Sequence, residues 1–170
     1  MEGLTIRPFE DADLPGAASA LVEVHKTDGY PVEGVDNPAS WLRSDDVIAA
    51  WVADSGGKIV GHVAVMKPHG EDAVRMWIEQ SGDDEKNVAV LARLFVTSEA
   101  RGRATGEKLM QAATDYARRS HLRLVLDVMT KDRAAMRLYE RLGWAKIGEA
   151  THRYGDGQEI DAVCYVAPAG

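Results

Sequence analysis

The stretch that most constrains the fold is a strand–helix–strand pattern in the middle of the chain. Residues 88–96 form an apolar run, residues 105–119 carry apolar side chains at helical spacing, and residues 122–129 are apolar again. Two strands joined through a helix run parallel to each other in one sheet. The sequence therefore predicts a central parallel pair of strands covered by a helix.

The segments around this unit predict mostly antiparallel neighbours. Residues 47–53 and 58–66 are rich in β-forming side chains and flank an Asp-Ser-Gly-Gly turn, which is typical of a hairpin. The remaining expected elements are a strand over 4–9, a helix within 10–28, a short helix around 41–42, a helix over 132–142 closed by Gly143, and strands over 144–150 and 159–167. Polar residues 79–87 are expected to form an exposed loop. The predicted class is α/β, with a mixed, mostly antiparallel sheet, a central parallel strand pair and flanking helices.

Composition excludes several classes of function. The chain has 170 residues, which fits a single domain over 1–170, and its formal net charge of −7 disfavours a sequence-independent grip on nucleic acid. We expect no membrane segment, because no apolar run approaches the length that spans a bilayer. The acidic N-terminus does not resemble a secretion signal, and a single cysteine excludes an intrachain disulfide. We expect a cytoplasmic protein.

The corner between the strand over 88–96 and the helix over 105–119 reads Arg-Gly-Arg-Ala-Thr-Gly at residues 101–106. The start of a helix exposes unpaired backbone N–H groups, which suit an anion, and small residues let a bulky ligand approach the backbone. Arg101 and Arg103 add forked donors for phosphate oxygens. A solvated basic turn remains an alternative for this stretch alone. A Walker-type loop or a dinucleotide fingerprint does not match its glycines or its place in the chain.

The second half of the chain decides between these interpretations. Residues 132–144 read Asp-Arg-Ala-Ala-Met-Arg-Leu-Tyr-Glu-Arg-Leu-Gly-Trp one strand after the corner, and the pairing resembles the GNAT acetyltransferase superfamily. That family carries Arg/Gln-x-x-Gly-x-Gly/Ala at the start of its central helix and Asn-x-x-Ala-x-x-x-Tyr-x-x-x-Gly-Phe one strand later. The matching positions are Arg101, Gly106, Ala135, Tyr139 and Gly143. Two positions depart from the pattern: Ala104 replaces a glycine, and Asp132 replaces the asparagine.

The resemblance implies acetyl-CoA as co-substrate. The residues expected to contact it are Leu94, Phe95, Val96, Arg101, Gly102, Arg103, Ala104, Thr105, Gly106, Asp132 and Ala135. The pyrophosphate would lie on the backbone amides of 101–106, and an N–H of a bulged strand would polarise the thioester carbonyl. Tyr139 is the expected general acid for the departing thiolate. It also lies on an apolar helix face, so a purely structural role is the alternative.

The acceptor is expected to be a primary amine of a small molecule. Its candidate site residues are His25, Asp28, Tyr30, Trp41 and Arg93. His25 could accept a proton, Asp28 could bind an ammonium group, and Arg93 could bind a carboxylate. The alternatives are a surface histidine, a hydrophobic anchor made by Tyr30 and Trp41, and an exposed arginine. No residue of the strand over 88–96 offers a carboxylate as general base.

Two other functions stay open at this point. One is acetylation of a protein or peptide amine, and the other is a regulatory module that binds acyl-CoA without turnover. Ala104, Asp132 and the missing strand glutamate favour the latter. A homodimer is possible. The histidines show no ligand spacing for a metal, and Cys164 is expected to be a packed core thiol.

Overall fold

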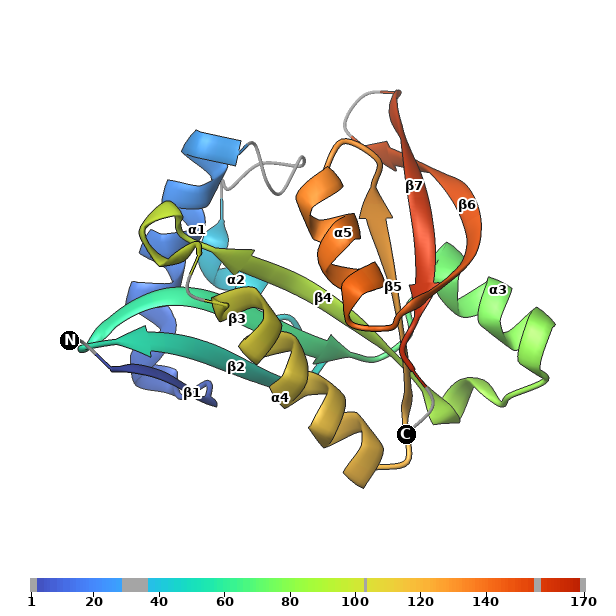
Figure 1. Cartoon of the computed structure of the whole chain (residues 1–170), viewed down its shortest axis with the longest axis horizontal. Helices are drawn as coiled ribbons and strands as arrows, with labels where there is room; N and C mark the ends of the chain where they lie inside the picture. Colours follow the sequence, from blue (N-terminus) through green and yellow to red (C-terminus); the bar gives the residue numbers. More distant parts are fainter. Residues whose placement is uncertain (1–2, 29–36, 103, 155–156, 169–170) are drawn as a thin grey trace. The chain divides into compact units, whose positions relative to one another are not determined.

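The computed structural model of the protein describes residues 3–28, 37–102, 104–154 and 157–168 (Figure 1). Its strands are hydrogen-bonded in the order β1-β2-β3-β4-β5-β7-β6, with β4 and β5 parallel. The predicted fold class is therefore confirmed. The elements are β1 (Leu4–Pro8), α1 (Leu14–Asp28), α2 (Pro38–Leu42), β2 (Val47–Ser55), β3 (Lys58–Met66), α3 (Asp72–Ser81), β4 (Val88–Val96), α4 (Thr105–Arg119), β5 (Arg123–Met129), α5 (Arg133–Arg141), β6 (Ala145–Tyr154) and β7 (Gln158–Val166), with short 3-10 turns at Asp11–Asp13, Glu85–Asn87 and Ser98–Ala100.

The chain forms two compact units. The first contains residues 1–66 and 92–113, and the second contains residues 67–91 and 114–170. Strand β4 and helix α4 therefore contribute residues to both units. None of the described helices is both long and apolar enough to cross a membrane.

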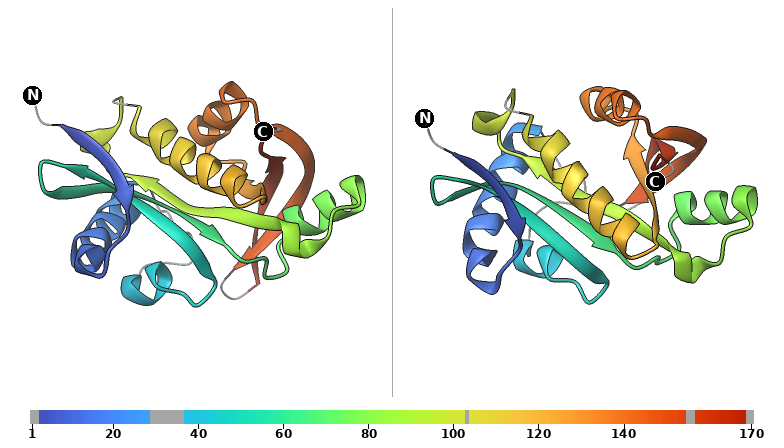
Figure 2. Two further views of the ribbon diagram at one scale, coloured as in Figure 1. Left: turned by 90° about the horizontal axis from the view of Figure 1, so that it is seen from below. Right: turned by 60° about the horizontal axis from the view of Figure 1, so that its bottom comes forward.

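The first unit is a sheet of β1, β2, β3 and the second half of β4, with helices on both faces. Helix α1 and the start of α4 lie on opposite faces of these strands (Figure 2). The core on the α1 face contains Leu21, Leu42, Val52 and Phe95, all 3% exposed or less. Burial of these apolar side chains supplies the main stabilising free energy of the unit.

Gly61 in β3 allows the close packing on the other face. A β-carbon at this position would lie 3.0 Å from the Leu109 side chain and 3.1 Å from the Phe95 carbonyl oxygen. Both distances are shorter than ordinary carbon contacts. The glycine therefore lets β4 and α4 approach β3 closely, beside the part of β4 that forms the candidate site.

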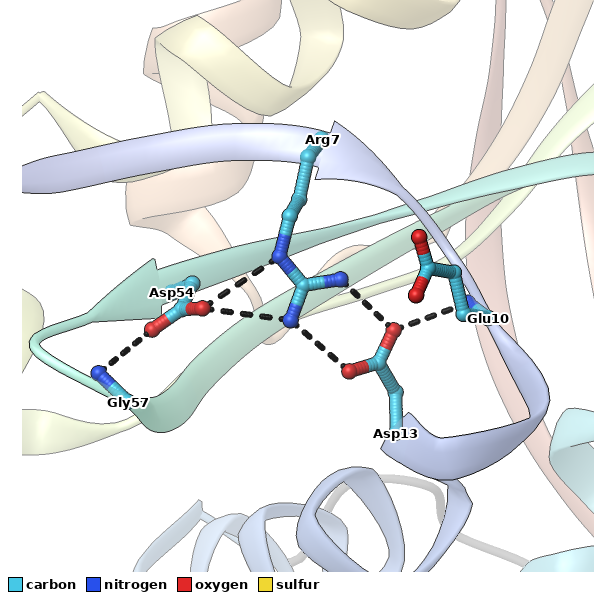
Figure 3. A network of polar contacts seen from close by, with 5 residues as sticks. All are labelled: Arg7, Glu10, Asp13, Asp54 and Gly57. Carbon is cyan, nitrogen blue, oxygen red and sulfur yellow. Dashed lines mark hydrogen bonds and ion pairs between the residues drawn. The ribbon is translucent and has the colours of Figure 1, made fainter.

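An ion-pair network joins β1, the entry to α1 and the β2–β3 hairpin (Figure 3). The two terminal nitrogens of Arg7 donate to the two oxygens of Asp13 at 2.8 Å each, and Arg7 also donates to Asp54 at 3.1 and 3.3 Å. Asp13 is only 8% exposed and accepts a further bond from the Glu10 amide. The Arg7 guanidinium lowers the pKa of the Asp13 carboxyl. Charge pairing thus holds the first strand against the hairpin.

The second unit contains β5, β6, β7 and the first half of β4. The parallel pairing aligns Val88 with Arg123 and Val90 with Val125, and β7 pairs antiparallel with both β5 and β6. Helix α5 ends where expected, with Gly143 at a φ of 89°. A glycine adopts this left-handed conformation without steric cost.

Helix α3 corrects the sequence prediction. Residues 79–87 were expected to be a loop, but residues 79–81 belong to α3, which ends at Gly82 with a φ of 78°. The helix buries Ala73 and Val74. Its last turn, residues 79–81, is polar and continues into the polar residues 82–87, which explains why these residues were assigned to one loop.

Candidate functional site

Strand β4 contains a backbone irregularity at Arg93. Its φ is 56°, in the left-handed region that a non-glycine residue rarely adopts. The Arg93 carbonyl oxygen lies 2.8 Å from Nδ1 of His62 in β3. Strained backbone of this kind is common where a strand bulges beside a functional site. We therefore take Arg93 as the position of the bulge that the resemblance implies, and call it the β4 bulge below.

The start of α4 forms the second part of the candidate site, also in the first unit. Arg101 and Gly102 are exposed, Gly102 has a φ of 82°, and open space surrounds the position that a Gly102 β-carbon would take. The first turn of the helix is fixed by Thr105, whose hydroxyl donates to the Ala100 carbonyl at 2.9 Å. The exposed, small-residue backbone ahead of a 15-residue helix fits an anionic group such as a pyrophosphate. Arg103 lies outside the described residues.

The Arg101 side chain has a role that the sequence did not predict. Its guanidinium donates to the Val96 carbonyl at 3.1 Å, so it ties the turn to the end of β4. Leu94 and Val96 are half-buried, whereas the Phe95 side chain packs in the core. Any contact that Phe95 makes with acetyl-CoA therefore has to come from its backbone.

Ala104 is exposed and has a φ of 58°, in the left-handed region. Its carbonyl accepts a bond from the Lys108 amide at 3.0 Å, so it precedes the helix directly. The left-handed conformation costs a non-glycine residue roughly 1–2 kcal/mol, and a glycine avoids this cost but loses more backbone entropy on folding. The strain at Ala104 is thus a property of the fold itself.

We expect Ala104→Gly to raise the free energy of unfolding by about 0.5 kcal/mol. The substitution removes the backbone strain, and the larger loss of backbone entropy of a glycine on folding offsets part of this gain. Urea denaturation measures this change. The matched control is Ala112→Gly inside α4, which is expected to lower the free energy of unfolding by about 1 kcal/mol. A loss of stability on Ala104→Gly would contradict the left-handed assignment.

Tyr139 lies in the second unit, on α5. Its side chain is 6% exposed, and its ring packs against Trp144 and Tyr165 with centroids 6.1 and 5.9 Å away. Burial raises the pKa of the phenol, and the nearby Asp132 carboxylate raises this pKa further. The hydroxyl therefore stays protonated at neutral pH, as a proton donor must.

Asp132 precedes α5 and is half-buried, and its side chain does not cap the helix. Its carbonyl accepts from the Met136 amide at 3.1 Å, which fixes the start of the helix. Ala135 is half-buried one turn later. Ala135 and Tyr139 therefore lie on the same short helix, and Asp132 lies directly before it, as the motif requires.

We expect Asp132→Asn to strengthen acetyl-CoA binding about fivefold, the value of one additional hydrogen bond of about 1 kcal/mol. An asparagine amide can donate to the ligand, whereas an ionised carboxylate can only accept. Titration calorimetry of the two proteins with acetyl-CoA gives the ratio. Equal or weaker binding by the variant would show that this position does not contact the ligand.

The structure brings together two of the five expected acceptor-site residues. The Arg93 guanidinium lies over the Trp41 ring, 4.9 Å from its centroid, and donates to the Met66 sulfur at 2.9 Å. His25 is half-buried near the end of α1, and its Nδ1 is buried without a hydrogen-bond partner among the described residues. Asp28 ends the same helix, but its side chain and Tyr30 lie outside the described residues.

The remaining side chains that could bind a metal or act as a nucleophile are considered together. Within the residues that the structure describes, no group of three or more His, Cys, Asp or Glu side chains is placed to hold a metal ion. Cys164 is fully buried in β7, and burial raises the pKa of its thiol to about 12. It is a core thiol, as predicted. His62 was not among the predicted site residues, although it contacts the bulge.

Comparison with known proteins places the motifs in a family context. The model of the acetyltransferase (GNAT) family matches residues 17–144. An uncharacterized N-acetyltransferase of Methanocaldococcus jannaschii is 33% identical over 105 residues, which are 61% of this chain and 42% of the relative. The N-acetylaspartate synthetase of Xenopus tropicalis is 32% identical over 108 residues, 63% of this chain and 34% of the relative. The chain thus spans less than half the length of these curated relatives.

Solved structures show the same fold. NAA60 of Arabidopsis thaliana in complex with acetyl-CoA superimposes with a TM-score of 0.73 at 17% identity, covering 96% of this chain and 97% of the other. At this identity the likeness concerns the arrangement of the elements, not the substrate.

Proposed function

Because the chain belongs to the acetyltransferase (GNAT) family, we propose that it transfers the acetyl group of acetyl-CoA directly to a primary amine. The observation that carries the proposal is the left-handed bulge at Arg93, which lies in β4 within the matched residues. A bulge takes a peptide group out of the regular ladder, so that its N–H can bind a substrate oxygen. The exposed turn ahead of α4 fits the pyrophosphate of the same ligand.

The chain's own groups supply the steps of the reaction. An N–H of the bulge would hydrogen-bond the thioester carbonyl oxygen and stabilise negative charge that develops there. The amine nitrogen would form a bond to the carbonyl carbon, and the carbon–sulfur bond would break. By the resemblance, Tyr139 would then donate its proton to the departing thiolate. Burial raises the pKa of its phenol, so the hydroxyl is protonated and available as a donor at neutral pH. The proton that the amine loses would pass to solvent, and Tyr139 would regain from solvent the proton that it gives to the sulfur.

We propose further that the acceptor carries a carboxylate near its amine. Arg93 is half-buried and lies over the Trp41 ring, 4.9 Å from its centroid, and a guanidinium has forked donors that suit a planar anion. The name of the N-acetylaspartate synthetase, one of the relatives at 32% identity, supports an acceptor of the amino-acid class. Acetylation of a protein or peptide amine is the alternative. The cytoplasmic location and the homodimer stay predictions.

Release of free thiol from acetyl-CoA tests the proposed function. The amine panel should pair amino acids with their decarboxylated amines and include short peptides. We expect turnover with amines, and faster turnover with those that carry the carboxylate. Equal rates for an amino acid and its decarboxylated amine would show that Arg93 does not bind an acceptor carboxylate. A preference for peptides would favour the alternative acceptor. Saturable binding of acetyl-CoA without turnover across the panel would favour a regulatory binding module.

A further inference from the structure

The Arg93 carbonyl contacts the side chain of His62. In a regular strand a carbonyl bonds to a neighbouring strand's backbone, but at the left-handed Arg93 it lies 2.8 Å from the imidazole Nδ1 of His62. A carbonyl oxygen only accepts, so Nδ1 must be the protonated nitrogen of the ring. A side chain of β3 thereby supplies a donor for the carbonyl of this left-handed residue.

The His62 ring is fixed in one orientation. It is fully buried, stacks on Phe95 with centroids 5.3 Å apart, and meets the Phe9 ring edge-on at 5.8 Å. Burial lowers the pKa of His62 to about 4, and the positive charge of Arg93 lowers it too, so the ring is neutral at pH 7. Neutrality and the aromatic packing keep the Nδ1–H directed at the bulge.

His62 is therefore unsuited to remove a proton from a substrate. Its Nε2 atom has the free lone pair, but that atom is buried and has no hydrogen-bond partner among the described residues. A base must reach the proton it abstracts. Burying Nε2 without a hydrogen bond costs free energy. We therefore assign the role of this histidine to the hydrogen bond of its other nitrogen, Nδ1.

We propose that His62 is a positioning residue that holds the β4 bulge and thereby aims the Leu94 amide at the thioester carbonyl of acetyl-CoA. In a trans peptide the C=O and N–H bonds point in opposite directions. Since the Arg93 carbonyl is bonded to His62, the N–H of Leu94 must point away from that ring. This inference rests on the proposed function, because it assigns the bulge amide to the thioester.

Two substitutions at His62 separate positioning from packing. His62→Leu keeps an apolar side chain but removes the donor, and we expect kcat to fall about 30-fold, less than the loss of a whole oxyanion donor. The KM for acetyl-CoA should change less than about threefold, since the amide acts mainly on developing charge. His62→Asn places an amide N–H near the position of Nδ1 and should restore kcat to within about fivefold of wild type.

A second change tests whether His62 acts through the backbone of Arg93. Glycine adopts a positive φ without steric cost, so Arg93→Gly should make the bulge independent of the histidine. We expect His62→Leu to lower kcat less than about threefold in the Arg93→Gly background, measured at saturating amine. Val63→Ala, a fully buried change on the same strand, is the packing control and should leave kcat within about twofold.

The spectroscopic readout requires no turnover. Nitrogen NMR of the wild-type protein should show a His62 ring that is protonated on Nδ1 alone, with a coupling across the hydrogen bond to the Arg93 carbonyl carbon. Protonation on Nε2, or no coupling, would overturn the inference even if the enzyme is active. An inactive wild type with the coupling present would overturn the proposed function and leave the bulge assignment standing. An equal loss of kcat in His62→Leu and His62→Asn would show that His62 contributes only through packing.

Discussion

Replacing Tyr139 with phenylalanine is expected to lower kcat about 100-fold, within the range of general acid catalysis. Affinity for acetyl-CoA should stay within about twofold, because the substitution removes one oxygen and keeps the ring that packs between Trp144 and Tyr165. Without the phenol, the thiolate must leave unprotonated or take a proton from water. Steady-state rates of thiol release and a calorimetric titration with acetyl-CoA give the two quantities.

Tyr165→Phe is the matched control for this experiment. Tyr165 belongs to the same aromatic cluster, is 1% exposed, and donates its hydroxyl to Glu140 at 2.7 Å. Its loss should affect stability and leave kcat nearly unchanged. If both variants lost the same activity, or if Tyr139→Phe kept full activity, Tyr139 would be a core residue and not the acid.

The raised pKa of Tyr139 has a consequence for the pH profile. The unperturbed phenol titrates near pH 10, and burial moves its pKa upward. An acid has to be protonated to act, so no loss of kcat from ionisation of Tyr139 is expected as the pH rises to about 10. A fall in kcat below that pH that disappears in Tyr139→Phe would contradict the burial of the hydroxyl.

Replacing Arg7 with methionine is expected to lower the free energy of unfolding by about 3 kcal/mol at pH 7. The variant loses the ion pairs of Arg7 with Asp13 and with Asp54. The carboxylate of Asp13, which is 8% exposed, is then left without a cation. A buried charge that has lost its partner is far more costly than a surface charge. Urea denaturation of both proteins measures the difference.

The pH dependence of this loss has a definite sign. Arg7 lowers the pKa of folded Asp13 below its unfolded value near 4, so the ion pair stabilises the fold above that value and stops doing so as the pH falls through the lowered pKa. The gap between wild type and Arg7→Met should therefore shrink below about pH 4. A gap of equal size at low pH would assign the effect to lost packing of the arginine.

The exposed pair of Arg43 and Asp11 is the control for Arg7. Their side chains are 46% and 90% exposed, although a guanidinium nitrogen of Arg43 lies only 2.6 Å from a carboxylate oxygen of Asp11. Exposed pairs contribute about 0–1 kcal/mol, so Arg43→Met should change stability far less than Arg7→Met. Comparable losses would mean that burial of Asp13 is not the reason for its importance.

The order of strands and helices could be read from the sequence because apolar periodicity and turn residues are local signals. The parallel β4–β5 pair, the hairpin of β2 and β3, and the end of α5 at Gly143 were all predicted in this way. Helix α3 was missed because its polar last turn, residues 79–81, continues into the polar residues 82–87 and was assigned with them to a loop. The family was recognised from two motifs at the right separation, and the family model confirms it.

The site could be predicted only in part. Short motifs locate the turn at 101–106 and Tyr139, but the bulge at Arg93 and its bond to His62 depend on two strands meeting in a particular register. The Arg7 network joins residues 47 positions apart for the same reason. For Ala104 the sequence showed only that it replaces a glycine of the motif, whereas the structure adds a strained backbone that no side-chain pattern reveals.

The most direct test of the proposed function is a calorimetric titration of the wild-type protein with acetyl-CoA, followed by addition of a carboxylate-bearing amine to the saturated complex. We expect saturable binding of acetyl-CoA, and then heat of reaction with release of one thiol per acetylated amine. The absence of acetyl-CoA binding at millimolar concentration would contradict the assignment of the β4 bulge and the α4 start to this ligand.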